Sequence, residues 1–337
     1  MNVNKILIIG MGVMGMRYYT LLNKEFPKVK IIVYRSTKKI NNKINVIKNI
    51  STYNDIDLAI NEKPDFCILC NPSSYRIKIL KKLIQGRINI LIEKPISNST
   101  KNIHEIQKLA KNKKVKILVG YNLRYLDSLI YLRNFVKSKK IGEFLGARCE
   151  VGQNIRYWRS KKDYKNSVST SKKLGGGVLL ELSHEIDYVN WIFGPIKWVQ
   201  AKLVKNEFLN LNVEDTAHLL FGVDHNKNEK LISINMDFVR EDKTRTCYVI
   251  GRKNSVFWDG NKNIVSKFNK KENKWDVIYK GKLDIPSTYL YQINQMIKLL
   301  NGKSEPKIKF SEGIQVIEII EAARRSDLKN KRINLGN

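Results

Sequence analysis

Short apolar runs alternate with amphipathic segments over the first third of the chain. The runs have the length of buried strands, and the segments between them carry apolar residues at helical spacing. The expected strands are 5–9, 29–34, 46–50, 64–70, 88–92 and 115–120, and the expected helices are 16–23, 54–61, 75–85 and 100–111. Strands and helices that alternate in this way favour a doubly wound parallel sheet. We therefore predict an α/β Rossmann domain over residues 1–121.

The pattern changes from Tyr121 onward. Longer strands with partial alternation follow one another with few helices between them, which indicates an antiparallel sheet with one covered face. The alternate residues from Ile232 to Phe238 line one face of a strand. The expected strands are 144–151, 196–204, 217–223, 231–239, 247–250, 256–258 and 275–279, and the expected helices are 126–137, 178–193, 287–300 and 311–328. We predict that residues 122–337 form an α+β domain built on a large, mainly antiparallel open sheet.

A glycine motif joins the first strand to the first helix. Gly10, Gly12 and Gly15 follow the apolar run directly, in the spacing G-x-G-x-x-G. The first glycine permits a sharp turn, the second lets a pyrophosphate approach the main chain, and the third lets the helix pack closely on the strand. The motif predicts that these glycines, with Val13 and Met14, bind a dinucleotide at the helix N-terminus. The alternative is an ordinary structural turn of an α/β sheet.

The end of the second strand bears on the choice of cofactor. Proteins that prefer NAD usually place a carboxylate there to hold the ribose hydroxyls. This chain has Tyr34, Arg35 and Ser36 instead. A guanidinium and a hydroxyl can hold a phosphate, so we predict that NADP is favoured over NAD through Arg35 and Ser36. The alternative is that Arg35 is a solvated loop charge.

Two further segments carry candidate chemistry. Lys94, in the sequence Glu93-Lys94-Pro95, follows a strand at the sheet edge where ligands of such folds bind. Desolvation beside a cationic nicotinamide would let this lysine exchange protons near neutral pH. Downstream, the glycines at 175–177 precede a predicted helix that carries Glu181, His184 and Asp187 at spacings of three.

This trio admits two interpretations. A histidine held by neighbouring carboxylates is a plausible proton relay for an alcohol under oxidation. A metal triad is the alternative, but no further ligand lies at motif spacing. We therefore predict proton transfer through His184 and no metal.

Composition sets limits on the class of protein. The chain of 337 residues is long enough for two domains, and 42% hydrophobic with 28% charged residues is typical of a globular protein. The net charge of +31 raises nucleic-acid binding as a rival, but the lysines are spread without one basic, aromatic-interleaved stripe. We expect a diffuse basic surface that attracts anionic substrates, and no nucleic-acid partner.

The cysteines and the hydropathy indicate a cytoplasmic protein. Cys67 and Cys70 point to opposite faces of a predicted strand, and four cysteines in all form no recognisable disulfide framework. Reduced, buried thiols are therefore expected. No apolar run reaches the length of about 18 residues that a membrane span needs, so no membrane partner is predicted.

Four motifs together resemble the Gfo/Idh/MocA family, which is named after glucose–fructose oxidoreductase, inositol dehydrogenase and a rhizopine-catabolism protein. They are the opening glycines, Glu93-Lys94-Pro95, the segment 120–124 and the segment 175–187, in this order. The resemblance implies an NAD(P)-dependent oxidoreductase acting on sugars, cyclitols or nucleotide sugars. It also implies a Rossmann domain followed by an open α/β domain that often mediates oligomers, here a homodimer or homotetramer.

The resemblance also implies roles for individual residues. Lys94 matches the family's catalytic lysine, His184 its catalytic histidine, and Glu93 its contact to the cofactor ribose. Asn71 and Pro72 match a segment that lies along the cofactor. The residues implied at the substrate are Tyr121, Asn122, Arg124, Gln153, Tyr157, Trp158, Arg159, Tyr164 and Glu181, together with His184.

The chain departs from the family's pattern at one place. The common pattern has Asp and His four residues apart, whereas Glu181 and His184 are three apart. Either Glu181 or Asp187 could partner His184, and Asp187 could equally be structural. The preferred hypothesis is that Lys94 and His184 form an acid/base pair facing the nicotinamide, and Arg159 would suit a phosphorylated or nucleotide-linked sugar. The rival hypothesis is a non-catalytic NADP-binding regulator on the same fold.

Overall fold

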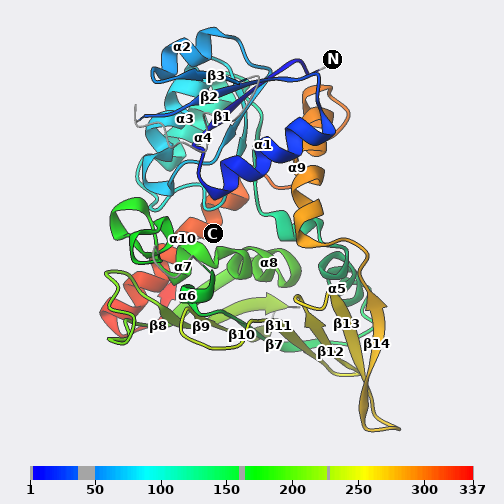
Figure 1. Ribbon diagram of the computed structural model, residues 1–337. Helices are drawn as coiled ribbons and strands as arrows, with labels where there is room; N and C mark the ends of the chain where they lie inside the picture. Colours follow the sequence, from blue (N-terminus) through cyan, green and yellow to red (C-terminus); the bar gives the residue numbers. More distant parts are fainter. Residues whose placement is uncertain (1–2, 37–49, 159–163, 226–227, 337) are drawn as a thin grey trace. The chain divides into compact units, whose positions relative to one another are not determined.

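A computed structural model describes residues 3–36, 50–158, 164–225 and 228–336 (Figure 1). The chain forms two units. The first unit is residues 1–121 with 289–314, and the second is 122–288 with 315–337. The division after Tyr121 coincides with the predicted boundary. Residues 289–314, predicted within the second domain, group instead with the first.

The first unit is a parallel sheet of strands in the order β3-β2-β1-β4-β5-β6 among the described residues. The strands are β1 Lys5–Ile9, β2 Lys30–Tyr34, β3 Ile50–Tyr53, β4 Phe66–Leu69, β5 Asn89–Ile92 and β6 Ile117–Val119. Residues 6–9 and 66–69 are almost fully buried, as expected for central strands covered on both faces. The predicted doubly wound parallel sheet is therefore confirmed.

The third strand lies later in the chain than predicted. The prediction was 46–50, and the observed strand is Ile50–Tyr53. Residues 46–49 lie outside the described part of the chain. The observed strand is at the edge of the sheet and only half-buried, so it lacks the apolar run by which a central strand is recognised.

Helices on this sheet come from both ends of the chain. They are α1 Val13–Glu25, α2 Ile56–Asn61, α3 Arg76–Gln85, α4 Ile103–Asn112 and most of α9 Ile285–Leu300. Figure 1 shows α9 beside α1, where the rings of Tyr18 and Tyr289 meet edge to face at 5.7 Å. The ammonium group of Lys116 donates to the carbonyl of Leu299 over 2.7 Å. These contacts explain why residues 289–314 belong to the first unit.

The second unit is built on a sheet with the order β14-β13-β12-β11-β7-β10-β9-β8-β15 among the described residues. The strands are β7 Phe144–Gly152, β8 Ile196–Val204, β9 Thr216–His225, β10 Asn228–Asp237, β11 Thr244–Gly251, β12 Ser255–Asp259, β13 Ile264–Asn269, β14 Lys274–Lys280 and β15 Ile333–Asn334. Within this described set, β7 and β10 pair in parallel and the other neighbours pair antiparallel. The predicted mainly antiparallel sheet is confirmed.

One face of this sheet is covered by helices. The helices of the unit are α5 Asp127–Lys137, α6 Ile155–Trp158, α7 Val178–Glu181, α8 Ser183–Phe193 and most of α10 Phe310–Lys329. Short 3₁₀ turns occur at Ser73–Tyr75, Asn122–Tyr125, Tyr164–Asn166, Val168–Thr170 and Lys172–Leu174. Trp258 of β12 donates its indole N–H to the Ser128 hydroxyl of α5 over 2.8 Å, and its ring meets Tyr188 of α8. The sheet and its helices therefore share one core, in which the predicted row from Ile232 to Phe238 is also buried.

No helix in the described ranges is long and apolar enough to cross a bilayer.

Candidate cofactor and catalytic sites

The three motif glycines have different surroundings. Gly10 has φ +91°, and a β-carbon there would lie 2.7 Å from the main-chain N of Asn71. A β-carbon on Gly15 would lie 2.0 Å from the carbonyl O of Gly10, so the helix packs against the turn. A β-carbon on Gly12 would meet no atom of the described residues within 4 Å. The turn is thus closed toward the protein at Gly10 and Gly15 and open to a ligand at Gly12.

The helix that follows is suited to an anion. Gly12 caps α1 without a side-chain hydrogen bond, and the first turn of the helix carries no acidic residue. Val13 is 63% exposed, and Met14 is half-buried. The main-chain N–H groups and the positive end of the helix dipole therefore face outward and can hold a phosphate.

Arg35 and Ser36 follow β2 beside this turn. The Gly10 N–H donates to the carbonyl of Tyr34 over 3.5 Å, and the Arg35 N–H donates to the carbonyl of Tyr53 over 3.0 Å. Arg35 is half-buried and Ser36 is exposed. Within 34–36 no carboxylate is present to repel a phosphate. The residues from 37 onward in this loop lie outside the described part of the chain.

Asn71 presents a buried amide that has no partner among the described residues. The side chain is 7% exposed, and neither Oδ1 nor Nδ2 makes a hydrogen bond within that part of the chain. It follows β4, next to the glycine turn, since the Cys70 N–H donates to the carbonyl of Ile9 over 2.8 Å. Pro72 comes directly after it and begins a 3₁₀ turn. Because buried amides in proteins are nearly always hydrogen-bonded, Asn71 fits a polar ligand at this strand end.

Glu93 is held in a buried hydrogen-bond chain. Its Oε1 accepts from the Tyr18 hydroxyl over 2.7 Å, and its Oε2 accepts from the Lys94 N–H over 3.2 Å. Gln292 of α9 lies 2.6 Å from the same hydroxyl. The nearest Gln292 atom is the acceptor Oε1, and a hydroxyl has one hydrogen to donate, so Tyr18 can serve only one of the two acceptors, Glu93 or Gln292, at a time.

Burial and charge act in opposite directions on Glu93. Burial raises the pKa of this carboxyl, while the Tyr18 hydrogen bond and the charges of Arg76 and Lys94 oppose that rise. Lys94 itself is half-buried and precedes Pro95 through a cis peptide bond. Glu93 and Lys94 therefore lie at the carboxyl end of β5, as predicted from the sequence.

Arg76 is a residue of this unit that was not predicted from the sequence. It is 4% exposed, and its Nε donates to the carbonyl of Asn71 over 2.8 Å. Its Nη1 donates to the carbonyls of Glu93 and Pro95. A signal was available, because Arg76 shares the buried stripe of α3 with Leu80, and a charged residue on an apolar stripe requires an explanation.

In the second unit, the glycine segment precedes two short helices rather than one. Gly175 and Gly177 have φ +82° and +113°, and a β-carbon on Gly176 would lie 2.5 Å from the carbonyl O of Val168. The predicted helix 178–193 is broken at Leu182, which has φ −97° and ψ 25°. The expectation that Glu181 and His184 lie three apart on one helix face is therefore wrong. Glu181 ends α7 and is half-buried.

His184 lies in the first turn of α8, 9% exposed. Asp187, one turn further, accepts from Arg124 Nε over 2.9 Å and from its Nη2 over 2.7 Å. Both of these side chains are almost fully buried. Arg124, predicted at the substrate, is thus held inside the unit, and Asp187 has the structural role that was one of its two predicted alternatives.

Tyr121 and Asn122 are also buried. Tyr121 is fully buried in the first unit, directly after β6. Asn122, in the second unit, donates its Nδ2 to the Thr288 hydroxyl over 2.7 Å. These residues shape the chain around the end of β6, and neither offers an exposed side chain to a ligand.

The segment before the glycines is more open. Tyr157 is 58% exposed and donates its hydroxyl to Glu241 Oε2 over 2.8 Å, while Trp158 meets Phe238 edge to face. The Gln153 N–H donates to Asp237 over 3.4 Å, and the Tyr164 carbonyl accepts from a hydroxyl. Arg159 lies outside the described residues. Glu241 is a further carboxylate that no sequence motif indicated.

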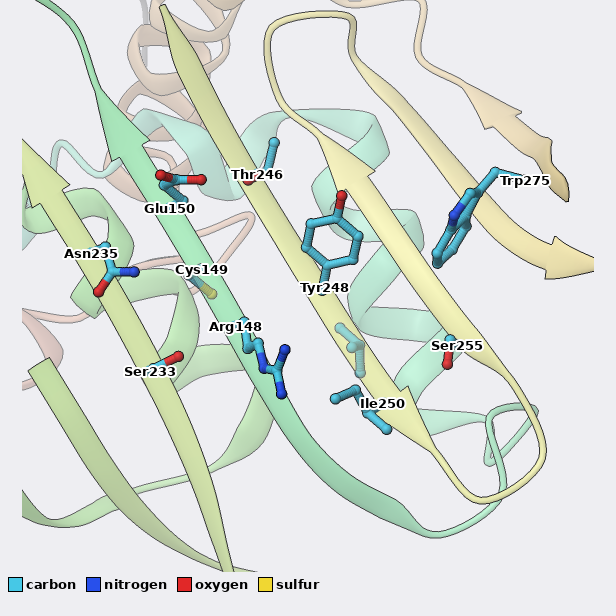
Figure 2. A pocket seen from close by; sticks show the side chains of 11 residues that line it. Arg148, Cys149, Glu150, Ser233, Asn235, Thr246, Tyr248, Ile250, Ser255 and Trp275 are labelled. Carbon is cyan, nitrogen blue, oxygen red and sulfur yellow. The ribbon is translucent and has the colours of Figure 1, made fainter. Parts of the chain in front are cut away.

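A hollow of about 380 Å³ lies on the uncovered face of the second sheet. Figure 2 shows Arg148 and Glu150 on β7, Tyr248 on the neighbouring β11 opposite Arg148, and Trp275 further to the right. None of the predicted site residues is among those described residues that line it. In the described ranges, no group of three or more His, Cys, Asp or Glu residues is placed to hold a metal ion.

The topology and the glycine turn together define the class of the first unit. The strand order 3-2-1-4-5-6 is the dinucleotide-binding order, and the glycine turn opens onto a helix N-terminus after β1. A buried amide without a partner in the described chain lies at the neighbouring strand end. The first unit is thus a Rossmann dinucleotide-binding fold.

The chain belongs to the Gfo/Idh/MocA oxidoreductase family. Residues 4–121 match the family's NAD-binding Rossmann fold, and residues 133–335 match its C-terminal alpha/beta domain. The resemblance deduced from the motifs is confirmed.

Relatives and solved structures extend this result. The D-xylose dehydrogenase of Paenarthrobacter nicotinovorans is 28% identical over 178 residues, which cover 51% of this chain and 45% of that protein. The chain spans about half the length of the first curated relatives it matches. A levoglucosan dehydrogenase complex with NADH and L-sorbose has TM-score 0.86 at 16% identity, with 100% of both chains covered. The WlbA dehydrogenase of Bordetella pertussis, in complex with NADH and UDP-GlcNAcA, has TM-score 0.82 at 17% identity, again over 100% of both chains. At such identities the likeness to these two structures concerns the fold.

Proposed function

We propose that this protein is an NAD(P)-dependent oxidoreductase that transfers a hydride between nicotinamide and a hydroxyl or keto carbon of a sugar, cyclitol or nucleotide sugar. The observation that carries the proposal is a glycine turn that is open at Gly12 and lies against Asn71 at Gly10, where the buried Asn71 amide has no partner in the described chain. A phosphate fits the first feature and a polar group of the same ligand fits the second. Family membership supports the reaction class.

The first unit would hold the cofactor through main chain and side chains together. The main-chain N–H groups from Gly10 to Gly15 would bind the pyrophosphate. Glu93, fixed by Tyr18, would accept from ribose hydroxyls, and Asn71 with Pro72 would lie along the dinucleotide. When bound, the nicotinamide supplies the hydride acceptor or donor, and the protein supplies orientation.

We propose NADP as the favoured cofactor. Arg35 and Ser36 follow β2 without a carboxylate beside them in sequence, so a 2′-phosphate meets a guanidinium and a hydroxyl rather than a negative charge. The solved relatives named above hold NADH. A comparison of NADPH with NADH is therefore the first measurement to make.

Lys94 and His184 are the proposed acid/base pair. One removes the hydroxyl proton of the substrate as hydride departs, and the other stabilises the developing alkoxide by charge or a hydrogen bond. Replacing Lys94 by Met and His184 by Gln tests these roles. Each change should lower kcat by about 10²- to 10⁴-fold with cofactor affinity retained. If the two act on one proton, the double variant should lose less than the product of the single losses.

The substrate would contact Glu181 and the segment from Tyr157 to Tyr164, which includes Trp158 and Arg159. Tyr157 is exposed, and the net charge of +31 favours an anionic sugar such as a phosphorylated or nucleotide-linked one. D-xylose, L-sorbose and UDP-GlcNAcA occur in the names of relatives and solved structures, so they begin the test panel.

A turnover assay over this panel tests the proposed function. Sugars, cyclitols and nucleotide sugars are offered with NAD and with NADP, and the absorbance of the reduced cofactor is followed. Reduction by any of them supports the oxidoreductase. Tight cofactor binding with no turnover on the whole panel would favour the rival, a non-catalytic NADP-binding regulator.

We also propose that the uncovered sheet face joins copies of the chain into a homodimer or homotetramer. Tyr248, Phe257 and Trp275 form an aromatic cluster there, with ring centroids 4.3 to 6.0 Å apart. Tyr248 is 43% and Trp275 41% exposed, which is high for large aromatic side chains on a sheet. Replacing both by Asp should yield a monomer by analytical ultracentrifugation, and an unchanged mass would contradict this interface.

A further inference from the structure

Arg76 joins the ends of two neighbouring strands of the first unit. Its guanidinium donates to the carbonyl of Asn71, which follows β4, and to the carbonyls of Glu93 and Pro95, which follow β5. The residue is 4% exposed and stands at the start of α3. A single side chain therefore fixes the main chain on both sides of Lys94 and at Asn71.

The fold alone gives little reason for a cation at this position. The N-terminal end of a helix carries positive potential, which disfavours a guanidinium, and the first turn of α3 has no acidic residue to offset it. Removing the charge from water is a further unfavourable contribution. Arg76 also shares its buried stripe with Leu80, Leu83 and Ile84, where an apolar residue would pack without that penalty. The guanidinium therefore persists for what it holds in place.

The geometry requires arginine rather than a general cation. A guanidinium presents five N–H groups in a fixed plane, so it can reach several carbonyls at once, whereas a lysine has a single nitrogen. The acceptors here belong to residues of two separate loops. Replacement by lysine would keep the charge and lose the fork.

We propose that Arg76 is a positioning residue for the cofactor, setting the main chain at Asn71 and at Glu93 so that the amide and the carboxylate stand ready before the dinucleotide binds. The inference rests on the proposed function. Groups ordered in advance bind more tightly, because their ordering no longer opposes the binding free energy. The charge of Arg76 also favours the ionised form of Glu93 against burial.

Three variants test this role: Arg76→Lys, Arg76→Gln and the control Lys78→Gln, an exposed lysine on the same helix. Binding of NADH and NADPH is measured by nicotinamide fluorescence, and folding by circular dichroism and thermal unfolding without cofactor. Arg76→Lys should bind the cofactor about 10- to 100-fold more weakly while it remains folded, since small displacements of binding groups have effects of this size. Lys78→Gln should bind like the wild type.

The pH dependence of cofactor binding separates charge from geometry. Glu93 is faced by Tyr18 of α1, by Cys70 at the end of β4, by Arg76 of α3 and by Lys94, with the polar Gln292 of α9 behind Tyr18. Without the charge at residue 76, the pKa of Glu93 rises further. As the pH is lowered, the Arg76→Gln variant should therefore begin to lose cofactor affinity at a higher pH than the wild type does. Arg76→Lys keeps the charge, so its cofactor affinity should fall over the same pH range as that of the wild type. If Arg76 were merely structural, the pH range over which cofactor binding is lost would be the same in both variants and the wild type.

The outcomes are distinguishable. Wild-type affinity in Arg76→Lys would overturn the inference and leave the proposed function intact. Failure of the wild type to bind either dinucleotide would refute the proposed function itself. If Arg76→Gln does not fold, Arg76→Lys carries the test, and failure of both to fold would assign Arg76 to the fold alone and overturn the inference.

Discussion

Replacing Gly12 by Ala should weaken cofactor binding strongly and leave the fold intact. Gly12 has φ −75°, which alanine adopts freely, and a β-carbon there meets no described atom within 4 Å. Alanine is a poorer helix cap than glycine by less than about 1 kcal/mol. The free energy of unfolding without cofactor should therefore change by no more than this amount.

The effect on binding follows from the same open space. A phosphate oxygen must come within about 2.9 Å of a main-chain nitrogen to accept its hydrogen bond. A methyl group over the helix N-terminus would hold the phosphate away from these N–H groups. Losing two hydrogen bonds to a charged group, each worth about 1.5–3 kcal/mol, corresponds to a loss of affinity of at least about 100-fold.

Gly15→Ala is the matched contrast. A β-carbon there would lie 2.0 Å from the carbonyl O of Gly10, so α1 must move away from the turn. Such overpacking costs about 1–3 kcal/mol, or more, even without cofactor. Urea unfolding and NADPH titration of both variants give the two quantities. Unchanged cofactor affinity in Gly12→Ala, or a loss of stability equal to that of Gly15→Ala, would refute the reasoning.

The remaining predictions concern charge and burial. Arg35→Asp should weaken NADP binding far more than NAD binding, and equal losses in parallel titrations would exclude the phosphate role. Asp187→Asn should lower the free energy of unfolding in urea by about 3–5 kcal/mol, because the buried Arg124 guanidinium loses its counter-charge; a loss below about 1 kcal/mol would contradict this. Hydrogen bonds from Tyr53 and Lys5, with the nearby charge of Lys30, lower the pKa of Glu62 to about 2, so stability from this carboxylate is present above its ordinary pKa and is lost as the pH falls toward 2; Glu62→Gln should flatten that part of the stability profile, and an unchanged profile would argue against it. Asn71→Leu should retain or raise stability without cofactor, since a buried amide without a described partner is unfavourable, while weakening dinucleotide binding in a fluorescence titration; a large loss of stability would show that the amide has an internal role.

Local hydrophobic pattern predicted the type of both sheets and most of their strands, because central strands are identified by their own apolar residues. The strands Ile264–Asn269 and Ile333–Asn334 of the second sheet were not predicted. The local pattern gave a wrong prediction where contacts with residues distant in sequence determine the structure. The strand Ile50–Tyr53 lies at a sheet edge and is only half-buried, so it carries no continuous apolar run. The segment 178–187 contains no glycine or proline that would have indicated the helix break at Leu182. Residues 289–314 join the first unit through contacts such as Tyr18 with Gln292, which are 274 positions apart.

In the candidate site, too, the features that are local in sequence were predicted and those that depend on distant residues were not. The glycine motif could be recognised because its strand, turn and helix are contiguous in sequence. The pairing of Arg124 with Asp187 spans 63 positions, so no local pattern indicated that both charges would be used internally. Arg76 lies on the apolar stripe of α3, but its acceptors are main-chain carbonyls, so no residue type in the sequence identified what it would bind.

Burial and hydrogen bonding together distinguish motif residues that serve the fold from motif residues that fit a ligand. Arg124 and Asn122 are buried and have internal partners, so the fold itself accounts for them. Asn71 is similarly buried, but its amide has no partner in the described part of the chain, and the fold alone would favour an apolar side chain there. The unfavourable burial of that amide must be offset in a state where something else satisfies it. Since Asn71 lies against Gly10, in the same turn whose described surroundings are open at Gly12, the requirement of Asn71 and the space at Gly12 point to the same ligand.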